Sequence, residues 1–310
     1  MYRLKFLALM VLMGAGCMVT AQKQVAITID DVPNIRKYKS DANMTFLNYL
    51  SENRIPSAIF INESRLRNDP DNSLVYLKPW IEDKYVTAGS HTFSHPHYSK
   101  VDLDTFKKDI IKGLEVSKKI AAQTGKSVKY FRFPYNDLGN DSLEHDAIHN
   151  VLDSLKLIST PFTVESSDWM FNAIYEYYLN NDSLSQAREI GQAYVDATMR
   201  SFAWMDSLTV AQYGRQLKHI YLCHDNSINA DFLPDIVERL KAKDYTFISL
   251  DDAMTDEVYR QQSHFYKSWG ISWVYRWMSD EAARKKLMRQ EPGVMEYYKL
   301  YERLRSSQSY

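Results

Sequence analysis

Residues 24–31 read Gln24-Val25-Ala26-Ile27-Thr28-Ile29-Asp30-Asp31, and this stretch decides the fold that we expect. A short apolar run that ends in acid is typical of a buried strand. Two adjacent carboxylates at the end of such a strand cannot both be solvated and also lie in a core, so Asp30 or Asp31 requires a metal ion or a cationic partner. Taken alone, the pair is better explained as a loop pair or a helix cap.

Strand and helix patterns alternate along the rest of the chain. Further strands are predicted at residues 57–62, 85–88, 129–133, 157–165, 219–223 and 246–250. The spacing of apolar residues predicts helices between them, including residues 41–53, 103–124 and 183–205. This alternation implies parallel strands, right-handed crossovers and therefore an α/β fold. Seven such units favour a barrel, complete or incomplete, and an open doubly wound sheet is the competing fold.

Two pairs of histidines have the spacing of metal ligands. His91 and His95 follow the third predicted strand, and imidazoles four residues apart in one helical turn share a face and can bind one ion. His145 and His149 have the same spacing, but they lie in a polar helical stretch with no acid-bearing strand end beside it. We therefore expect His145 and His149 to face solvent, and His97 to lie at the rim of the site.

Three further groups of polar residues follow predicted strands. They are Arg132-Phe133-Pro134-Tyr135, Asp168-Trp169 and Leu222-Cys223-His224. An arginine can hold a carboxylate by a bidentate pair and keep it ionised. Each group is a weak signal by itself, but (β/α) barrels build their active sites from the carboxyl ends of their strands. We therefore expect these side chains to converge on one mouth of the barrel.

The chain resembles the polysaccharide deacetylases of carbohydrate esterase family 4. Five motifs carry the resemblance, and they occur in the family's order as TIDD, HTFSH, RFPY, the Asp-Trp of SSDW, and LCH. The match covers residues 25–250, which is most of the mature chain. The resemblance implies a distorted (β/α)7 barrel, and we expect a helical segment to be appended to it at the C-terminal end.

The resemblance also implies a metal site. Asp31, His91 and His95 correspond to the ligands of a divalent metal ion, for which we expect Zn²⁺, with Co²⁺ as the alternative. Two histidines and one carboxylate leave positions on the ion open, which is typical of a catalytic rather than a structural site. Asp30 corresponds to the catalytic base, and Arg132 to the residue that tunes it.

The remaining motif residues are implied to handle the substrate and the leaving group. His224 corresponds to the general acid, and Asp168 to its partner. Tyr135 corresponds to the residue whose backbone N–H helps to bind the oxyanion. Leu222 corresponds to the residue of the acetyl pocket, and Trp169 to a residue that lines the groove.

The chain departs from the family pattern at Phe133, Asn136 and Glu165, and residues 171–218 form a long helical stretch. These departures concern the shape of the groove, so they affect the identity of the substrate more than the chemistry. We expect metal-dependent hydrolysis of N-acetyl groups from a GlcNAc-containing glycan or oligosaccharide. The alternatives are an O-acetyl esterase on an acetylated polysaccharide and a non-catalytic glycan-binding barrel. A binding protein needs neither a base nor an acid, so the complete residue set argues against the last.

The net charge limits the classes of binding partner, and the N-terminal sequence indicates the cellular location. The formal net charge is −1 over 310 residues, so nothing points to nucleic acid or to an anionic membrane, and an acetylated carbohydrate is the partner that we expect. Residues 1–21 have the pattern of a signal peptide: Arg3 and Lys5 are basic, residues 4–13 are apolar apart from Lys5, and Val19-Thr20-Ala21 is a suitable cleavage site.

The predicted organisation is a signal peptide over residues 1–21, a catalytic barrel over residues 22–255 and a helical extension over residues 256–310. We expect an exported protein, periplasmic or extracellular. Processing as a lipoprotein at Cys17 is the alternative to cleavage after Ala21.

Overall fold

The computed structural model describes residues 22–34, 42–66 and 70–307 of the chain. The predicted signal peptide, with Cys17 and the cleavage site, lies outside these residues. Among the helices of the described part, none is both long enough and apolar enough to cross a membrane.

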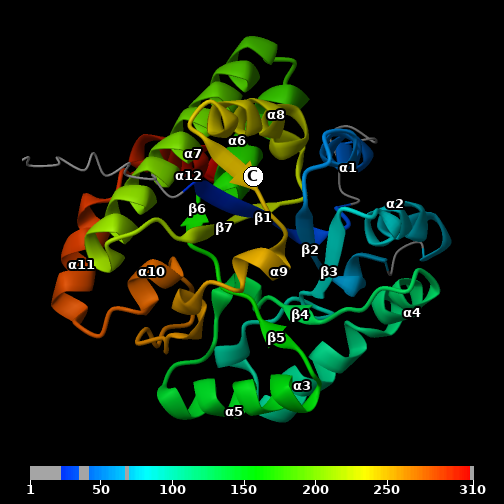
Figure 1. The fold of residues 1–310 in the computed structure, drawn as a ribbon. Coiled ribbons are helices and arrows are strands. Elements are labelled where there is room, and N and C mark those ends of the chain that lie inside the picture. Colours follow the sequence, from blue (N-terminus) through cyan, green and yellow to red (C-terminus); the bar gives the residue numbers. More distant parts are fainter. Residues whose placement is uncertain (1–21, 35–41, 67–69, 308–310) are drawn as a thin grey trace, which may run out of the picture.

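Parallel strands form one curled sheet at the centre of the molecule (Figure 1). The order along the sheet is β5-β4-β3-β2-β1-β7-β6, and β8 pairs in addition with the first residues of β1. The predicted distorted (β/α)7 barrel is confirmed, since the sheet curls into a partial barrel with helices around it. The strands are β1 (Lys23–Val32), β2 (Ser57–Ile61), β3 (Val86–Ser90), β4 (Tyr130–Phe131), β5 (Ile158–Ser159), β6 (Val164–Glu165), β7 (Lys218–His224) and β8 (Tyr245–Phe247).

The carboxylates of Asp30 and Asp31, near the carboxyl end of β1, both lie at one edge of the sheet. The pairing of β1 with β7 places Asp30 opposite His224. Its pairing with β2 shifts register between Ile29 and Val32, and Asp31 has a φ of 67°. Adjacent side chains of a regular strand point to opposite faces, whereas a bulge redirects one of them. The irregularity therefore lets Asp30 and Asp31 line the same pocket.

Helices cover the outside of the sheet and pack against one another in sequence-distant pairs, such as α1 with α8 and α2 with α4 (Figure 1). The α-helices are α1 (Ala42–Glu52), α2 (Pro70–Glu82), α3 (Leu103–Lys112), α4 (Glu115–Gln123), α5 (Ser142–Ser154), α6 (Asp168–Asn180), α7 (Leu184–Tyr213), α8 (Ser227–Lys241), α9 (Leu250–Ala253), α10 (Trp273–Arg276), α11 (Glu281–Gln290) and α12 (Met295–Ser307). Short 3₁₀ turns are η1 (Glu63–Leu66), η2 (Tyr98–Lys100), η3 (Pro134–Asn136) and η4 (Glu257–Arg260).

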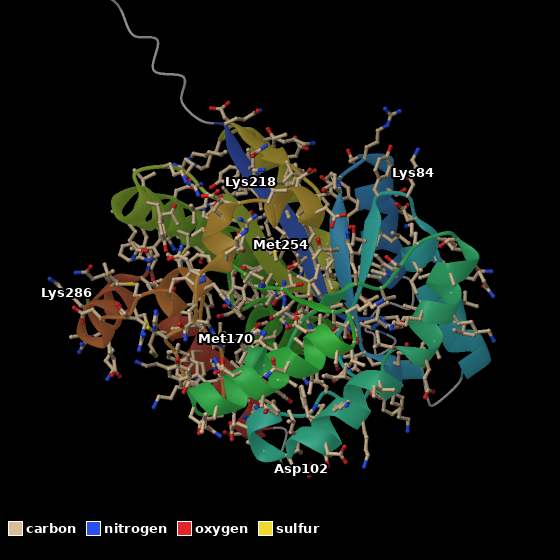
Figure 2. The ribbon with its side chains drawn as sticks, turned by 60° about the horizontal axis from the view of Figure 1, so that its bottom comes forward. Lys84, Asp102, Met170, Lys218, Met254 and Lys286 are labelled. Carbon is tan, nitrogen blue, oxygen red and sulfur yellow. The ribbon has the colours of Figure 1, made fainter. Side chains whose placement is uncertain are left out.

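The hydrophobic core lies between the sheet and these helices. Met170 on α6 is buried in it, whereas Lys84, Asp102 and Lys286 are exposed at the surface (Figure 2). Removal of apolar area from water is the main force that holds such a layered fold together.

The single helix predicted over residues 103–124 is wrong, because the structure contains two helices, α3 and α4, with a break at Gly113. A Cβ atom on Gly113 would lie 2.4 Å from the backbone carbonyl carbon of Thr92, so the chain approaches the loop after β3 closely at this point. The buried carboxylate of Glu63 accepts hydrogen bonds from two backbone N–H groups in the first turn of α4. Both contacts come from distant residues, so the local periodicity could not reveal the break.

The single strand predicted over residues 157–165 is also wrong. Strand β5 pairs with β4 and β6 pairs with β7, and across the described residues no pairing joins β5 to β6. The barrel is therefore open between these two strands. The C-terminal segment fills the opening: the N–H of Trp273 donates to the carbonyl of Phe162 at 2.9 Å, and the hydroxyl of Ser272 donates to the carbonyl of Thr163 at 2.7 Å.

The other long helical regions lie beside one another at one side of the barrel. The stretch over residues 171–218 is occupied mostly by α6 and α7, which pack together. Helix α12 near the C-terminus lies against α6, where the ring centroid of Tyr297 is 4.9 Å from that of Phe171.

Candidate metal centre and catalytic site

A pocket of about 650 Å³ opens at the carboxyl ends of β1, β3 and β7. Most of the site residues predicted from the sequence line it, namely Asp30, Asp31, His91, His95, Tyr135, Trp169, Leu222 and His224. The other two, Arg132 and Asp168, are buried beside Asp30 and His224 respectively. The structure thus brings all of the predicted site residues together.

Asp31, His91 and His95 form a cluster of potential metal ligands. One donor atom from each lies within 4.8 Å of the other two. Nε2 of His91 is 3.1 Å from Nε2 of His95, which in turn is 3.6 Å from Oδ1 of Asp31. That Oδ1 is buried without a hydrogen-bond partner among the described residues. A carboxylate oxygen and two imidazole nitrogens that converge in this way fit a divalent ion such as Zn²⁺.

The protonation of the cluster also fits a metal site. Nδ1 of His91 lies 2.8 Å from the carbonyl oxygen of Arg132, so it is the nitrogen that carries the proton and donates, which leaves Nε2 free to bind. Burial lowers the pKa of His91 and of His95 to about 4. Burial alone would raise the pKa of Asp31, but Arg65 and the two imidazoles hold it well below its usual range. At neutral pH the ligands are therefore in the forms that bind a metal ion.

The loop that carries the two histidines is held in a strained conformation. Thr92 and His95 have φ values of 64° and 60°, in the left-handed region that residues other than glycine rarely adopt. The carboxylate of Asp109 on α3 holds this loop by accepting hydrogen bonds from the N–H groups of Phe93 and Ser94. Backbone strain of this kind clusters at functional sites, where the surrounding contacts must fix it.

Asp30 is a buried carboxylate with a fixed cation beside it. Burial raises the pKa of Asp30, and Arg132, whose Nη1 lies 3.8 Å from Oδ2, offsets part of that rise. The guanidinium of Arg132 is fully buried, donates to the hydroxyl of Thr28 at 3.0 Å and lies over the ring of Phe60. A carboxylate with a raised pKa at the wall of a pocket is a good candidate for a general base.

The imidazole of His224 is paired with the carboxylate of Asp168. Nδ1 of His224 lies 2.7 Å from Oδ1 of Asp168, and Oδ2 of the same carboxylate accepts hydrogen bonds from the backbone N–H of His224 and from the amide of Asn229. Burial alone would lower the pKa of His224, but the charge and hydrogen bond of Asp168 raise it to about 10. At neutral pH this imidazole therefore carries a positive charge, and His224 lines the pocket.

The three predicted substrate-binding residues lie on different walls of the pocket. Leu222 is buried on β7, whereas about half of the Tyr135 and Trp169 side chains is exposed. The ring of Tyr135 stacks on His97, with 3.6 Å between centroids, which places His97 next to the pocket as predicted. Tyr135 has a φ of 56°, so the turn after β4 is strained as well.

Sequence reasoning missed several residues of this pocket. Arg65 on η1 lies outside every motif, yet its Nη2 is 2.8 Å from Oδ2 of Asp31. Glu165, noted only as a departure from the family pattern, lines the pocket, and burial together with the charge of Asp168 raises its pKa to about 7. Trp269 and Gly270 come from the C-terminal segment, well beyond the last motif.

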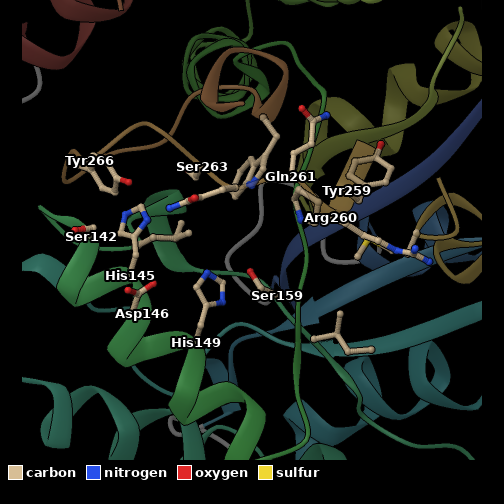
Figure 3. A pocket seen from close by; sticks show the side chains of 16 residues that line it. Ser142, His145, Asp146, His149, Ser159, Tyr259, Arg260, Gln261, Ser263 and Tyr266 are labelled. Carbon is tan, nitrogen blue, oxygen red and sulfur yellow. The ribbon is translucent and has the colours of Figure 1, made fainter. Parts of the chain in front are cut away.

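The second histidine pair lies in a different place. His145 and His149 lie on α5 and line a pocket of about 450 Å³ together with Tyr266. Figure 3 shows these three side chains around the pocket. His149 is exposed as predicted, but the prediction for His145 is wrong, because it is buried with its ring 4.7 Å from that of Tyr266. In the part of the chain that the structure describes, Asp31, His91 and His95 form the one cluster of three or more potential metal ligands.

The fold and the site together define a class: a parallel barrel whose pocket combines potential metal ligands with a buried carboxylate and an imidazole–carboxylate pair. The family model of the polysaccharide deacetylases matches residues 18–155, which contain the first three motifs. The chain is therefore similar to the polysaccharide deacetylases of carbohydrate esterase family 4.

Similar proteins include a deacetylase and a pseudoenzyme. A peptidoglycan-N-acetylglucosamine deacetylase from Bacillus cereus is 24% identical over 146 residues, which are 47% of this chain and 46% of that protein, so this chain matches about half of that relative's length. The structure of the Bc1960 peptidoglycan N-acetylglucosamine deacetylase has a TM-score of 0.53 at 18% identity, with 75% of this chain and 88% of that chain covered.

The structure of BA3943, a family 4 pseudoenzyme from Bacillus anthracis, has the same TM-score of 0.53 at 16% identity, with 76% of this chain and 66% of that chain covered. At these identities the likeness shows the fold alone. Since a deacetylase and a pseudoenzyme share that fold, activity has to be argued from the residues of this chain.

Proposed function

We propose that this protein is a metal-dependent deacetylase that removes N-acetyl groups from a GlcNAc-containing glycan or oligosaccharide. The observation that carries the proposal is that one pocket combines the Asp31, His91 and His95 cluster with Asp30 and with His224. A protein that only bound a glycan would need neither a buried carboxylate with a raised pKa nor an imidazole held protonated by a second carboxylate.

A divalent ion, Zn²⁺ or else Co²⁺, held by Asp31, His91 and His95 would polarise the acetyl carbonyl and make a water molecule more acidic. Asp30 then accepts a proton from the attacking water, for which its raised pKa makes it a competent base. Arg132 orients Asp30 and balances its charge. Leu222 forms the apolar wall for the acetyl methyl group, and the backbone N–H of Tyr135 serves as a donor to the oxyanion.

The second half of the reaction depends on His224. The water oxygen has become bonded to the acetyl carbon, and the bond from that carbon to the sugar nitrogen breaks. His224 gives its proton to this nitrogen, so the products are acetate and a free amine. Asp168 keeps the imidazole charged beforehand and fixes its orientation.

Acetate release from a panel of substrates tests the proposal. The panel contains N-acetylated chitooligosaccharides, peptidoglycan and an O-acetylated xylan, each with and without a chelator. We expect release from the N-acetylated substrates, loss of it with chelator, and recovery on addition of Zn²⁺ or Co²⁺. Release from acetylated xylan alone would make the protein an O-acetyl esterase. Absence of release from every substrate by zinc-loaded protein would favour a non-catalytic binding role.

We also propose that the protein is exported, which the signal-peptide pattern of residues 1–21 supports. N-terminal sequencing of the exported protein is expected to begin near Gln22. A lipid-modified Cys17 as the first residue would contradict this cleavage site and favour a lipoprotein instead.

A further inference from the structure

The C-terminal segment contributes two residues to the wall of the pocket. Trp269 and Gly270 line it together with the motif residues, although they lie beyond the last strand. The indole of Trp269 is 51% exposed, and its ring lies edge-on to Phe265 at 5.4 Å. A large aromatic side chain that is half-exposed at the mouth of a catalytic pocket calls for an explanation, because burying it elsewhere would stabilise the fold.

This wall is fixed to the turn that follows β4. The N–H of Gly270 donates to the carbonyl oxygen of Tyr135 at 2.9 Å. On the other side of Trp269, the carbonyl oxygen of Ser268 lies 3.2 Å from Nδ1 of His97, in the loop that follows β3. Backbone groups on both sides of Trp269 are thus bonded to residues that border the catalytic site, so the position of its indole relative to the site is set.

Asn136 and Arg276 also hold the C-terminal segment against the turn that follows β4. Arg276 is fully buried, donates to the carbonyl oxygen of Asn136 and stacks over Trp273, with its guanidinium carbon 4.3 Å from a ring centroid. A Cβ atom on Gly270 would lie 2.1 Å from the Cβ of Asn136, so only glycine fits here. The backbone carbonyl and the Cβ atom of Asn136 are therefore in contact with the C-terminal segment and help to fix its position.

Three half-exposed aromatic rings face the same pocket: Tyr135, Trp169 and Trp269 are 48%, 47% and 51% exposed. The C–H face of a pyranose ring is apolar, and it packs on an aromatic face while the hydroxyl groups at the sugar edge stay in water. Resting on the proposed function, we infer that Trp269 is a substrate-binding residue that stacks on a sugar ring next to the N-acetylated one. The C-terminal segment then selects oligosaccharides over single sugars.

Binding is measured with the Asp30→Asn variant, which retains the metal ligands. Because this variant lacks the proposed base, the measurement does not depend on turnover. The ligands are a β-1,4-linked GlcNAc tetrasaccharide and GlcNAc itself, titrated by calorimetry into zinc-loaded protein. Trp269→Ala is expected to weaken tetrasaccharide binding about 5- to 10-fold, whereas Trp269→Phe recovers most of the affinity. Binding of GlcNAc should change less than about twofold. Tyr298→Ala on α12 is the control, since Tyr298 is 45% exposed and lies outside the pocket.

The inference would be overturned by unchanged tetrasaccharide affinity in Trp269→Ala, or by an equal loss of affinity for GlcNAc and for the tetrasaccharide. Absence of tetrasaccharide binding to the parent protein would overturn it as well. Failure of the proposed function gives a different pattern, in which protein with Asp30 intact releases no acetate while the effect of Trp269→Ala on binding persists. Melting temperatures of all variants check that the segment has remained folded.

Discussion

Arg65 and Asp31 form an ion pair in which Nη2 of the guanidinium lies 2.8 Å from Oδ2 of the carboxylate. The other oxygen, Oδ1, has no hydrogen-bond partner within the described residues and lies 3.6 Å from Nε2 of His95. One oxygen is therefore held by a cation, while the other points toward the histidines. Partners of this kind orient a ligating carboxylate and keep it ionised.

Replacement of Arg65 by alanine is expected to weaken Zn²⁺ binding by about 10-fold or more, because the carboxylate of Asp31 loses its orientation. Competition with a chromophoric chelator measures the affinity. Arg65→Lys should recover part of it, and Arg303→Ala on α12 should have no effect. Tighter binding in Arg65→Ala would show instead that the guanidinium competes with the ion for Asp31.

The two histidine pairs allow a matched test of the metal site. His91→Ala is expected to lose most of the bound zinc, whereas His149→Ala should retain about one equivalent per chain. His149 is the better control of its pair, because it is exposed while His145 is buried. Elemental analysis of both variants after dialysis decides the matter. Equal zinc loss in both would mean that the ion is held elsewhere.

The sequence allowed the prediction of those site residues that follow strands. Asp30, His91 and His224 stand at or just after strand ends, and parallel pairing brings such ends to one edge of the sheet. Their convergence therefore follows from strand order alone. Arg65 and Trp269 follow from no such rule, because their proximity to the site depends on how a short turn and the C-terminal segment fold back.

The errors in secondary structure have a similar origin. Residues 103–124 have the periodicity of one helix, but the contact of Gly113 with Thr92 divides it. Residues 157–165 are apolar enough for one strand, yet they cross the opening of the barrel. The polarity of its helix predicts that His145 faces solvent, but Tyr266 from the C-terminal segment packs against it. In each case a tertiary contact decides what the local pattern leaves open.

Replacement of Gly113 by alanine tests the first of these contacts. The new methyl group would overlap the backbone of Thr92, which cannot move without displacing the loop from His91 to His95. Overpacking of this kind typically costs about 1–3 kcal/mol in the free energy of unfolding, and zinc affinity should fall with it. Denaturant unfolding and zinc titration provide the two measurements. Gly293→Ala is the control, because nothing lies within 4 Å of a Cβ atom there.

The His224–Asp168 pair predicts a dependence of stability and rate on pH. The charge and hydrogen bond of Asp168 raise the pKa of His224 to about 10, compared with about 6.5 for an unperturbed histidine. The protonated imidazole therefore stabilises the folded state fully below pH 6.5, and this contribution is lost as the pH rises through 10. In Asp168→Asn the alkaline limit of kcat/KM on an N-acetyl substrate should move to lower pH by roughly 1–3 units.

Profiles of kcat/KM and of unfolding free energy against pH, for wild type and Asp168→Asn, check this expectation. The wild type should lose more stability than the variant between pH 7 and 10, since only the wild type holds the proton tightly. Superimposable profiles would remove Asp168 as the group that sets the pKa of His224.

The role of His224 as a general acid can be separated from a structural role by the choice of leaving group. An amine leaves a tetrahedral intermediate only when it is protonated, because an amide anion is a very poor leaving group, whereas an alkoxide or phenoxide leaves far more readily. General acid catalysis is typically worth about 10²–10⁴-fold. His224→Ala should therefore lower the rate on an N-acetylated oligosaccharide by that order and the rate on an activated acetyl ester much less. Zinc content should stay unchanged, since His224 does not belong to the Asp31, His91 and His95 cluster.

If His224 were only a packed residue at a strand end, both rates would fall together and the melting temperature would drop in parallel. Both rates, the zinc content and the melting temperature of His224→Ala therefore decide the question, and an equal fall on amide and ester would remove this imidazole from the mechanism.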